Sequence, residues 1–259
     1  MDYSNKYIVT FAAVLCLVCS TVVSSIAVGL KDRQDANRIL DKRTMVLRVA
    51  NMVEDKEKPS FEEVDEMFKD IETIVIDLDE GSIVDVDPTT VDPRKNAKRP
   101  GVSKGITDEN ARKAGIKSVA TQQLVYLVRT PGKECVVFPF YGNGLWSTMY
   151  GFLCVTPDLS EVIGIIYYEQ GETAGLGSEV ENPRWRAQWV GKKALTADNE
   201  LQVKVVKQGL AKDKTTQVDG IAGATITSVA VTFALDFWFG EQGYGPALDQ
   251  IRAAAQEAK

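Results

Sequence analysis

An uncharged run of 23 residues, Ile8–Leu30, limits the folds open to this chain more than any other feature. An α-helix rises about 1.5 Å per residue, so the run spans roughly 34 Å, enough to cross a hydrocarbon core of about 30 Å. The run therefore predicts a transmembrane helix at residues 7–30, preceded by a short tail at residues 1–6.

A cleavable signal peptide is the competing interpretation, because Ser25–Ala27 resembles a cleavage site and Lys6 supplies a minimal positive region. The apolar core of a signal peptide is typically about 7–15 residues, which is shorter than this run. We therefore predict a retained anchor in contact with membrane lipid. Lys6 precedes the run while Lys31, Arg33 and Arg38 follow it, so positive charge does not set the orientation.

Composition narrows the chemistry of the rest of the chain. The sequence contains no histidine, which excludes Ser-His-Asp and Cys-His nucleophiles, His-ligated zinc and a His proton shuttle. Lys plus Arg number 30 against 36 Asp plus Glu, and no basic block marks a nucleic-acid binder. Any chemistry therefore uses carboxylates, hydroxyls, cysteines or a cofactor, and we predict no catalytic residue, no metal site and no nucleic-acid partner.

Four cysteines fall in two regions. Cys16 and Cys19 form a C-x-x-C pattern inside the apolar run, where packing at a helix interface is favoured over a redox or metal pair. Cys135 and Cys154 lie in apolar, strand-like segments, where we expect buried free thiols, with a disulfide as the alternative.

Residues 31–122 are predicted to form a helical stalk and the N-terminal part of a soluble domain. Apolar residues at helical spacing continue from Asp32 to Val53. Ser60–Glu63 has the capping-box pattern that opens a second helix, and Ile74–Leu78 follows as a short strand. Residues 85–105 are rich in Pro, Asp, Lys and Arg without a hydrophobic period, and predict an exposed insertion.

Residues 123–259 are predicted to complete an α+β domain with an antiparallel sheet, flanking helices and one core. The predicted strands are rich in β-branched and aromatic residues: Leu124–Val128, Glu134–Phe140, Thr148–Thr156, Val162–Glu169 and Leu201–Val206. The predicted helices are Asn182–Gly191, Val229–Phe239 and Ala247–Ala258. The second of these is apolar nearly all round, so it should be buried, with Thr227 or Ser228 as its cap.

The segment Val218–Ser228 carries the most informative chemistry. Small residues at positions 220, 222, 223 and 224 lead toward a helix start, so the backbone can approach a ligand closely. Amides at a helix N-terminus favour an anion such as phosphate, and Thr225 places a hydroxyl there. The residues alone favour a tight turn before an N-cap over a ligand site, and both interpretations stay open at this point.

Asp219–Thr227 resembles the D-x-x-[ST]-G-A-[ST]-x-[ST] signature of an FMN-binding domain family in which a flavin transferase joins the FMN phosphate to threonine as a phosphodiester. The resemblance implies covalent FMN on Thr225, with Thr227 as the next candidate. It also implies three residues that the transferase recognises: Asp219, Gly223 and Ala224. Ala222 departs from the signature, which usually has Ser or Thr there, so one hydroxyl that could bind phosphate is missing.

Further blocks resemble the C subunit of the bacterial sodium-translocating NADH:quinone oxidoreductase: Gly144–Ser147, Tyr167–Gly177, Glu181–Lys193 and Asp236–Trp238. With the anchor, the resemblance covers essentially the whole chain. It implies an electron-relay subunit within an inner-membrane complex of six subunits, with the soluble domain on the periplasmic side. No G-x-G-x-x-G motif follows a strand, so NADH oxidation is expected on another subunit.

The resemblance also implies a set of residues that bind FMN: Leu145, Trp146, Glu172, Thr173, Leu176, Lys207, Gly223 and Ala224. Trp146 and Leu176 offer flat apolar cover for the isoalloxazine ring. Glu172 and Thr173 offer polar contacts to the ring edge, and Lys207 offers a positive charge to the phosphate or the reduced ring. The ordinary interpretations are core for Trp146 and Leu176, a solvated loop for Glu172 and the surface for Lys207.

Two alternatives remain beside the sodium-translocating complex. The first is the homologous flavin subunit of the electron-transport complex that couples ferredoxin and NAD, which has the same signature. The second is a membrane-anchored envelope domain that binds or scaffolds other proteins without a redox role. In either flavin interpretation, the protein binds, orients and electrostatically tunes the cofactor that carries the electrons.

Overall fold

The computed structural model describes residues 4–257, which divide between Arg43 and Thr44 into two compact units. The first unit holds most of helix α1, Asn5–Val49, which already begins inside the predicted tail. Within the described residues, Asn5–Lys31 is the one segment long and apolar enough to cross a membrane, with a mean hydropathy of 2.4. The predicted N-terminal apolar helix is therefore confirmed.

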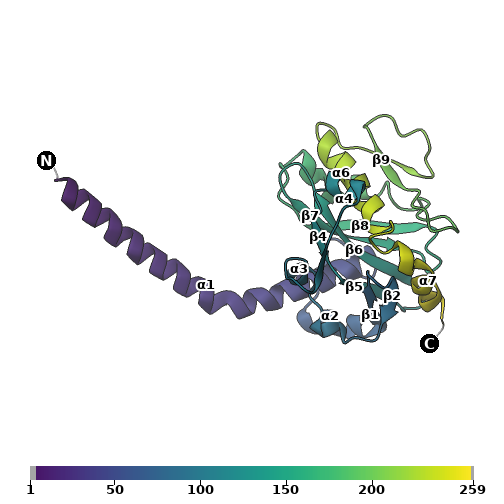
Figure 1. The fold of residues 1–259 in the computed structure, drawn as a ribbon, viewed down its shortest axis with the longest axis horizontal. Coiled ribbons are helices and arrows are strands. Elements are labelled where there is room, and N and C mark those ends of the chain that lie inside the picture. Colours follow the sequence, from purple (N-terminus) through teal and green to yellow (C-terminus); the bar gives the residue numbers. More distant parts are fainter. Residues whose placement is uncertain (1–3, 258–259) are drawn as a thin grey trace. The chain divides into compact units, whose positions relative to one another are not determined.

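The second unit is an α+β domain (Figure 1). After α1 its helices are α2 (Phe61–Met67), α3 (Pro93–Asn96), α4 (Glu109–Lys113), α5 (Pro183–Arg186), α6 (Thr225–Trp238) and α7 (Leu248–Gln256). Its strands are β1 (Ile71–Asp77), β2 (Ser82–Val84), β3 (Ser103–Gly105), β4 (Ser118–Ala120), β5 (Gln122–Val128), β6 (Cys135–Asn143), β7 (Thr148–Val155), β8 (Val162–Glu169), β9 (Lys204–Val206) and β10 (Gln217–Asp219). The predicted fold class is confirmed.

A six-stranded antiparallel sheet forms the centre of this unit, in the order β2-β1-β5-β6-β7-β8. The pairing of β1 with β5 runs from Ile71 opposite Val128 to Asp77 opposite Gln122. It brings the segment before residue 122 and the segment after it into one sheet. Two small sheets, β9 with β10 and β3 with β4, lie outside the main one.

Both faces of the large sheet are covered. Alternate side chains along each strand point to opposite sides, so each face packs against different elements. On one face Phe138 and Leu153 share a buried cluster with Val231 and Leu235 of α6. Figure 1 shows α6 and α4 on that side of the strands. On the other face the end of α1 lies against Gly164, where an added Cβ would come within 3.2 Å of the Val49 carbonyl oxygen.

The predicted exposed insertion at residues 85–105 is wrong in part. It contains α3 and β3, and Val91 and Ala97 within it are buried. Its helical turns begin at side-chain caps, since Asp87 and Asp92 accept hydrogen bonds from the amides of Thr89 and Lys95. Such local hydrogen bonding orders a segment without any hydrophobic period, which is why the period did not reveal it.

Several predicted boundaries also shift. The α6 helix begins at Thr225, so neither Thr227 nor Ser228 is its cap. Helix α1 ends at Val49 rather than Val53, and the predicted strand Leu201–Val206 pairs as a strand only from Lys204. The helix predicted over Asn182–Gly191 is regular only at Pro183–Arg186. The last helix ends at Gln256, and Ala258 of the prediction lies outside the described residues.

Candidate flavin site

Within the signature segment, Ile221–Ala224 form a tight turn, called the signature turn below, that leads directly into α6. The Ala224 amide donates to the Ile221 carbonyl at 3.1 Å, and Gly223 has a φ of +72°. Glycine is favoured at such a position because a side chain strains the left-handed conformation. Helix α6 starts at Thr225 without a side-chain cap among the described residues. Its first amides therefore point out of the turn and favour an anion.

Two threonines in the first turn of α6 have opposite environments. Thr225 is exposed at the helix start. Thr227 is only 2% exposed, and its hydroxyl donates to Glu172 Oε2 at 2.7 Å. An enzyme acting from outside would reach the hydroxyl of Thr225 and not that of Thr227. Thr225 is therefore the more accessible of the two threonines.

Glu172 is a buried hub that joins this helix to the loop after β6. Its Oε1 accepts hydrogen bonds from the amides of Trp146 at 2.8 Å and Ser147 at 3.1 Å. Its Oε2 accepts from the Leu145 amide at 3.1 Å and from Thr227. Four donors occupy the acceptor capacity of a carboxylate. Glu172 therefore holds the loop after β6 against α6, and its predicted contact with a ring edge stays a prediction.

Glycines give the Glu172 carboxylate the space that it needs. A Cβ on Gly144 would lie 2.7 Å from the Glu172 Cδ, and one on Gly177 would lie 2.6 Å from Oε2. Desolvation raises the pKa of Glu172, but the hydrogen bonds from Thr227 and the three amides outweigh it, so the pKa is lowered overall. The carboxylate is therefore ionised at neutral pH despite being 8% exposed.

Large apolar side chains stand exposed around this hub. Trp146 is 72% exposed and Leu145 is 51% exposed, and both are held by their amides on Glu172. Leu176 is 41% exposed, and its Cδ2 lies 2.9 Å from where a Cβ on Gly223 would stand. Ile226, at 59% exposed, was not predicted; the signal available was its place between two threonines on the first helical turn. We call these four residues the apolar rim.

Thr173 is exposed, and its carbonyl accepts from the amides of Leu176 and Ser178. Lys207 is exposed just after β9, whose Val206 carbonyl accepts from the Gly220 amide at 2.8 Å. Both residues are therefore in segments that border the signature turn.

Asp219 is held in place by three residues from two neighbouring segments. One carboxylate oxygen accepts from the Ala211 amide at 3.1 Å, and its carbonyl accepts from the Trp185 indole N–H at 2.9 Å. Its amide donates to the Gln188 side-chain oxygen at 3.0 Å. Trp185 and Trp189 are buried and in edge-to-face contact, with their ring centroids 5.5 Å apart. They anchor the start of the signature to the core.

Arg94 is a neighbour of the site that no sequence signal identified. It comes from α3 and forms a two-pronged ion pair with Glu169, with N–O distances of 2.5 and 2.6 Å. Its guanidinium also lies over the ring of Tyr150, 4.1 Å from the centroid. Glu169 ends β8, three residues before Glu172. Arg94 therefore holds the strand end that leads into the Glu172 loop.

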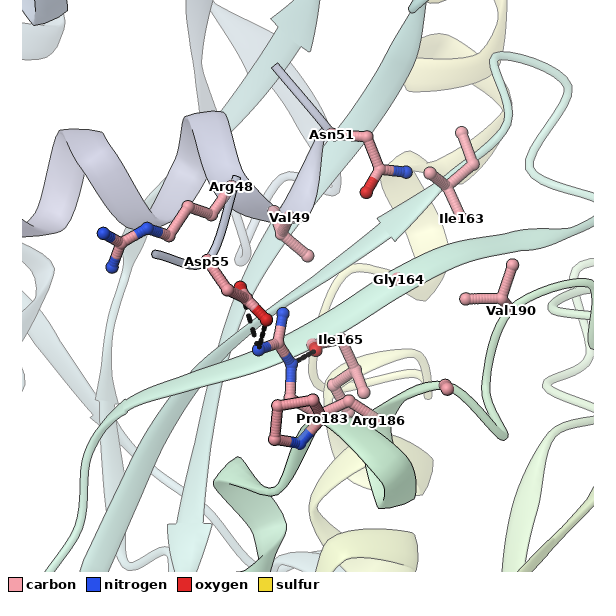
Figure 2. Close-up of a pocket in the computed structure, with 11 residues that line it drawn as sticks. Arg48, Val49, Asn51, Asp55, Ile163, Gly164, Ile165, Pro183, Arg186 and Val190 are labelled. Atoms are coloured by element: carbon pink, nitrogen blue, oxygen red, sulfur yellow. Dashed lines mark hydrogen bonds and ion pairs between the residues drawn. The ribbon is translucent and has the colours of Figure 1, made fainter. Parts of the chain in front are cut away.

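Two hollows lie in the second unit. A groove of about 370 Å³ runs beside the signature turn, lined by Gly220, Ile221 and Ala222 together with Trp185 and Arg184. A cleft of about 150 Å³ lies between the end of α1 and β8, where Arg186 binds the Ile165 carbonyl and Asp55 (Figure 2). None of the predicted site residues, all of which the structure describes, lines this second cleft.

A family model described as the FMN-binding domain matches residues 144–239. The C subunit of the Na(+)-translocating NADH-quinone reductase of Vibrio anguillarum is 47% identical to this chain, covering 92% of this chain and 91% of the relative. This chain belongs to that family of C subunits. The corresponding C subunit of Haemophilus ducreyi is 43% identical over 95% of this chain and 94% of its own length.

Solved structures of the family have the same fold. The crystal structure of Shewanella oneidensis NqrC superposes with a TM-score of 0.73 at 32% identity, covering 85% of this chain and 99% of that one. The C subunit from Parabacteroides distasonis superposes with a TM-score of 0.63 at 25% identity, covering 89% of this chain and 98% of that one. The resemblance predicted from the sequence blocks is confirmed.

The residues of the site fit FMN. An exposed hydroxyl stands at an uncapped helix start, which suits a phosphate, and the apolar rim beside it suits a flat ring. The matched FMN-binding region contains the turn, the Glu172 hub and all four rim residues.

Proposed function

We propose that the chain carries FMN on Thr225 through a phosphodiester and relays electrons within a sodium-translocating NADH:quinone reductase. The exposure of Thr225 at the start of α6, beside an enclosed Thr227, is the observation that carries the proposal. FMN supplies electron transfer when bound. The chain's own residues anchor the phosphate end at the turn, cover the ring with the apolar rim and hold both parts together through Glu172.

The attachment step is proposed as a phosphoryl transfer by a flavin transferase. A bond forms between the Thr225 Oγ and the phosphorus of the FMN moiety, while a pyrophosphate bond of flavin adenine dinucleotide breaks. Adenosine monophosphate leaves, and the hydroxyl proton passes to a base on the transferase. Asp219, Gly223 and Ala224 are the proposed recognition residues, and the positive φ of Gly223 is a conformation that glycine adopts more readily than other residues.

We further propose that α1 anchors the chain in a bacterial inner membrane, with the second unit in the periplasm and five other subunits as partners. The length and hydropathy of Asn5–Lys31 support an anchor that contacts lipid. The names of the relatives support membership of a larger complex. Those names also favour the sodium-translocating complex over the ferredoxin-linked alternative, and the FMN-binding match argues against a scaffold without redox function.

One measurement tests both the anchor and the cofactor. The full chain is produced in a host that contains the flavin transferase, and its intact mass is measured after denaturation. We expect the complete chain plus FMN less one water. A mass lacking the flavin would contradict the covalent attachment, and a mature chain starting at Val28 would show that the apolar run is a cleaved signal peptide.

A further inference from the structure

Ser228 lies one residue beyond the family signature and is almost fully enclosed, at 2% exposed. Its hydroxyl accepts a hydrogen bond from the Ile221 amide at 2.9 Å and donates one to the Ala224 carbonyl at 2.9 Å. The residue therefore binds the first and last positions of the signature turn at once.

The turn and the hydroxyl form a closed set of hydrogen bonds. Ile221 accepts from the Ala224 amide, and Ala224 in turn accepts from both the amide and the hydroxyl of Ser228. Gly220 makes room for this arrangement, since a Cβ there would come within 3.3 Å of the Ser228 Cβ. The one residue of the turn with a positive φ, Gly223, and the acceptor Thr225 both lie on the chain that this set constrains.

We propose that Ser228 is a positioning residue for flavin attachment, which holds the signature turn in the shape that the transferase binds. This inference rests on the proposed attachment of FMN to Thr225. Ser228 takes no part in the bonds that form and break there, because its hydroxyl is enclosed and already engaged on both sides.

Loss of the hydroxyl should weaken recognition rather than chemistry. Without it the enclosed Ile221 amide has no acceptor, so the turn populates open forms in which that amide reaches water. A binding partner that selects a fraction of the population shows an apparent affinity reduced by that fraction. The KM of the transferase for the chain should therefore rise, while kcat stays near its original value.

Thr232 provides a matched control on the same helix, one turn further on. Its hydroxyl accepts from the Val205 amide at 2.9 Å and donates to the Val205 carbonyl at 3.3 Å. This hydroxyl has the same two kinds of bond as that of Ser228. It holds β9 to α6, however, and does not touch the signature turn.

The test measures initial rates of flavin attachment on the full chain in detergent, using flavin transferase, flavin adenine dinucleotide and intact-mass detection. Ser228→Ala should raise KM about tenfold with kcat unchanged, a change that corresponds to about 1.4 kcal/mol. Thr232→Val should lower the melting temperature in the same way but leave KM within about twofold. Ser228→Cys, whose thiol is a weaker donor and acceptor, should give an intermediate KM.

A parent-like KM in Ser228→Ala would overturn the proposal. So would an equal rise in Thr232→Val, which would make the effect one of general stability, or a fall in kcat at constant KM. If Ser228→Ala does not fold, the Ser228→Cys variant decides in the same way. A parent chain that gains no flavin at all would contradict the proposed function itself, and this outcome is recorded before any variant is compared.

Discussion

Two enclosed polar side chains organise the candidate site, and they work in different ways. Glu172 accepts from four donors, three of which are backbone amides of the loop after β6. Ser228 accepts from one amide and donates to one carbonyl of a single turn. The Glu172 carboxylate accepts hydrogen bonds from two separate segments, whereas the Ser228 hydroxyl joins two positions of one turn. The Leu145 and Trp146 part of the apolar rim is therefore held by a charged group, and the signature turn is held by a neutral hydroxyl.

The largest expected effect distinguishes Thr225, the proposed attachment residue, from Glu172 and Ser228. Thr225→Ala should abolish covalent FMN completely and change the free energy of unfolding by less than about 0.5 kcal/mol, because the side chain is exposed and caps nothing. Intact mass and chemical denaturation of the purified chain check both statements. Thr225→Ser is the control and should keep the adduct. Stoichiometric FMN on Thr225→Ala would place the attachment elsewhere.

Replacing Glu172 should lower the free energy of unfolding more than replacing Ser228. Glu172→Gln turns an NH₂ group toward two donors, so we expect a loss of about 2–3 kcal/mol, against about 1–2 kcal/mol for Ser228→Ala. Urea unfolding of each variant, with the apolar helix kept in detergent, gives the comparison. Equal losses of unfolding free energy would show that the charge of Glu172 adds nothing to the stability of the loop that carries Leu145 and Trp146.

The stabilisation by Glu172 should also depend on pH, whereas that by Ser228 should not. The folded pKa of Glu172 lies below its ordinary value of 4.5, so the native state binds fewer protons than the unfolded state. Its stabilisation is present above that ordinary value and is lost as pH falls through the folded pKa.

Unfolding free energies of the parent and of Glu172→Gln should therefore converge as the solution is acidified from about pH 6 to about pH 3. The difference between the parent and Ser228→Ala should stay constant over the same range, because a hydroxyl does not titrate there. A constant gap for Glu172→Gln as well would mean that its carboxylate has an ordinary pKa in the folded chain.

The smallest effect concerns the rim itself. Trp146→Ala should keep covalent FMN but shift its one-electron potential by a few tens of millivolts, because an aromatic contact is worth about 0.5–1.5 kcal/mol and about 59 mV corresponds to a tenfold change. Phe61→Ala, at an aromatic residue 50% exposed in the first turn of α2, is the control and should leave the potential unchanged. A visible spectrum and potential equal to those of the parent would place the ring away from Trp146.

Much of this architecture is encoded locally and could be predicted from the sequence. The length of the uncharged run sets a span, and runs rich in β-branched and aromatic residues mark β5 to β8. The capping box at Ser60–Glu63 forms as predicted, with both of its hydrogen bonds present. Each of these depends on residues only a few positions apart, so spacing alone carries the information.

Contacts between distant segments were decided by the packing of the folded chain. Thr225 and Thr227 are alike as residues, but Thr227 is enclosed where Glu172, 55 positions away, approaches it, and Thr225 is exposed. Arg94 meets Glu169 across 75 positions because the insertion packs beside β8. The spacing of residues along the chain does not reveal such contacts, since strand register and helix packing determine which polar groups face each other after folding. The resemblance carried by the sequence limited the proposed flavin acceptors to the hydroxyls of Thr225 and Thr227, and the packing around Glu172 encloses Thr227 and leaves Thr225 exposed.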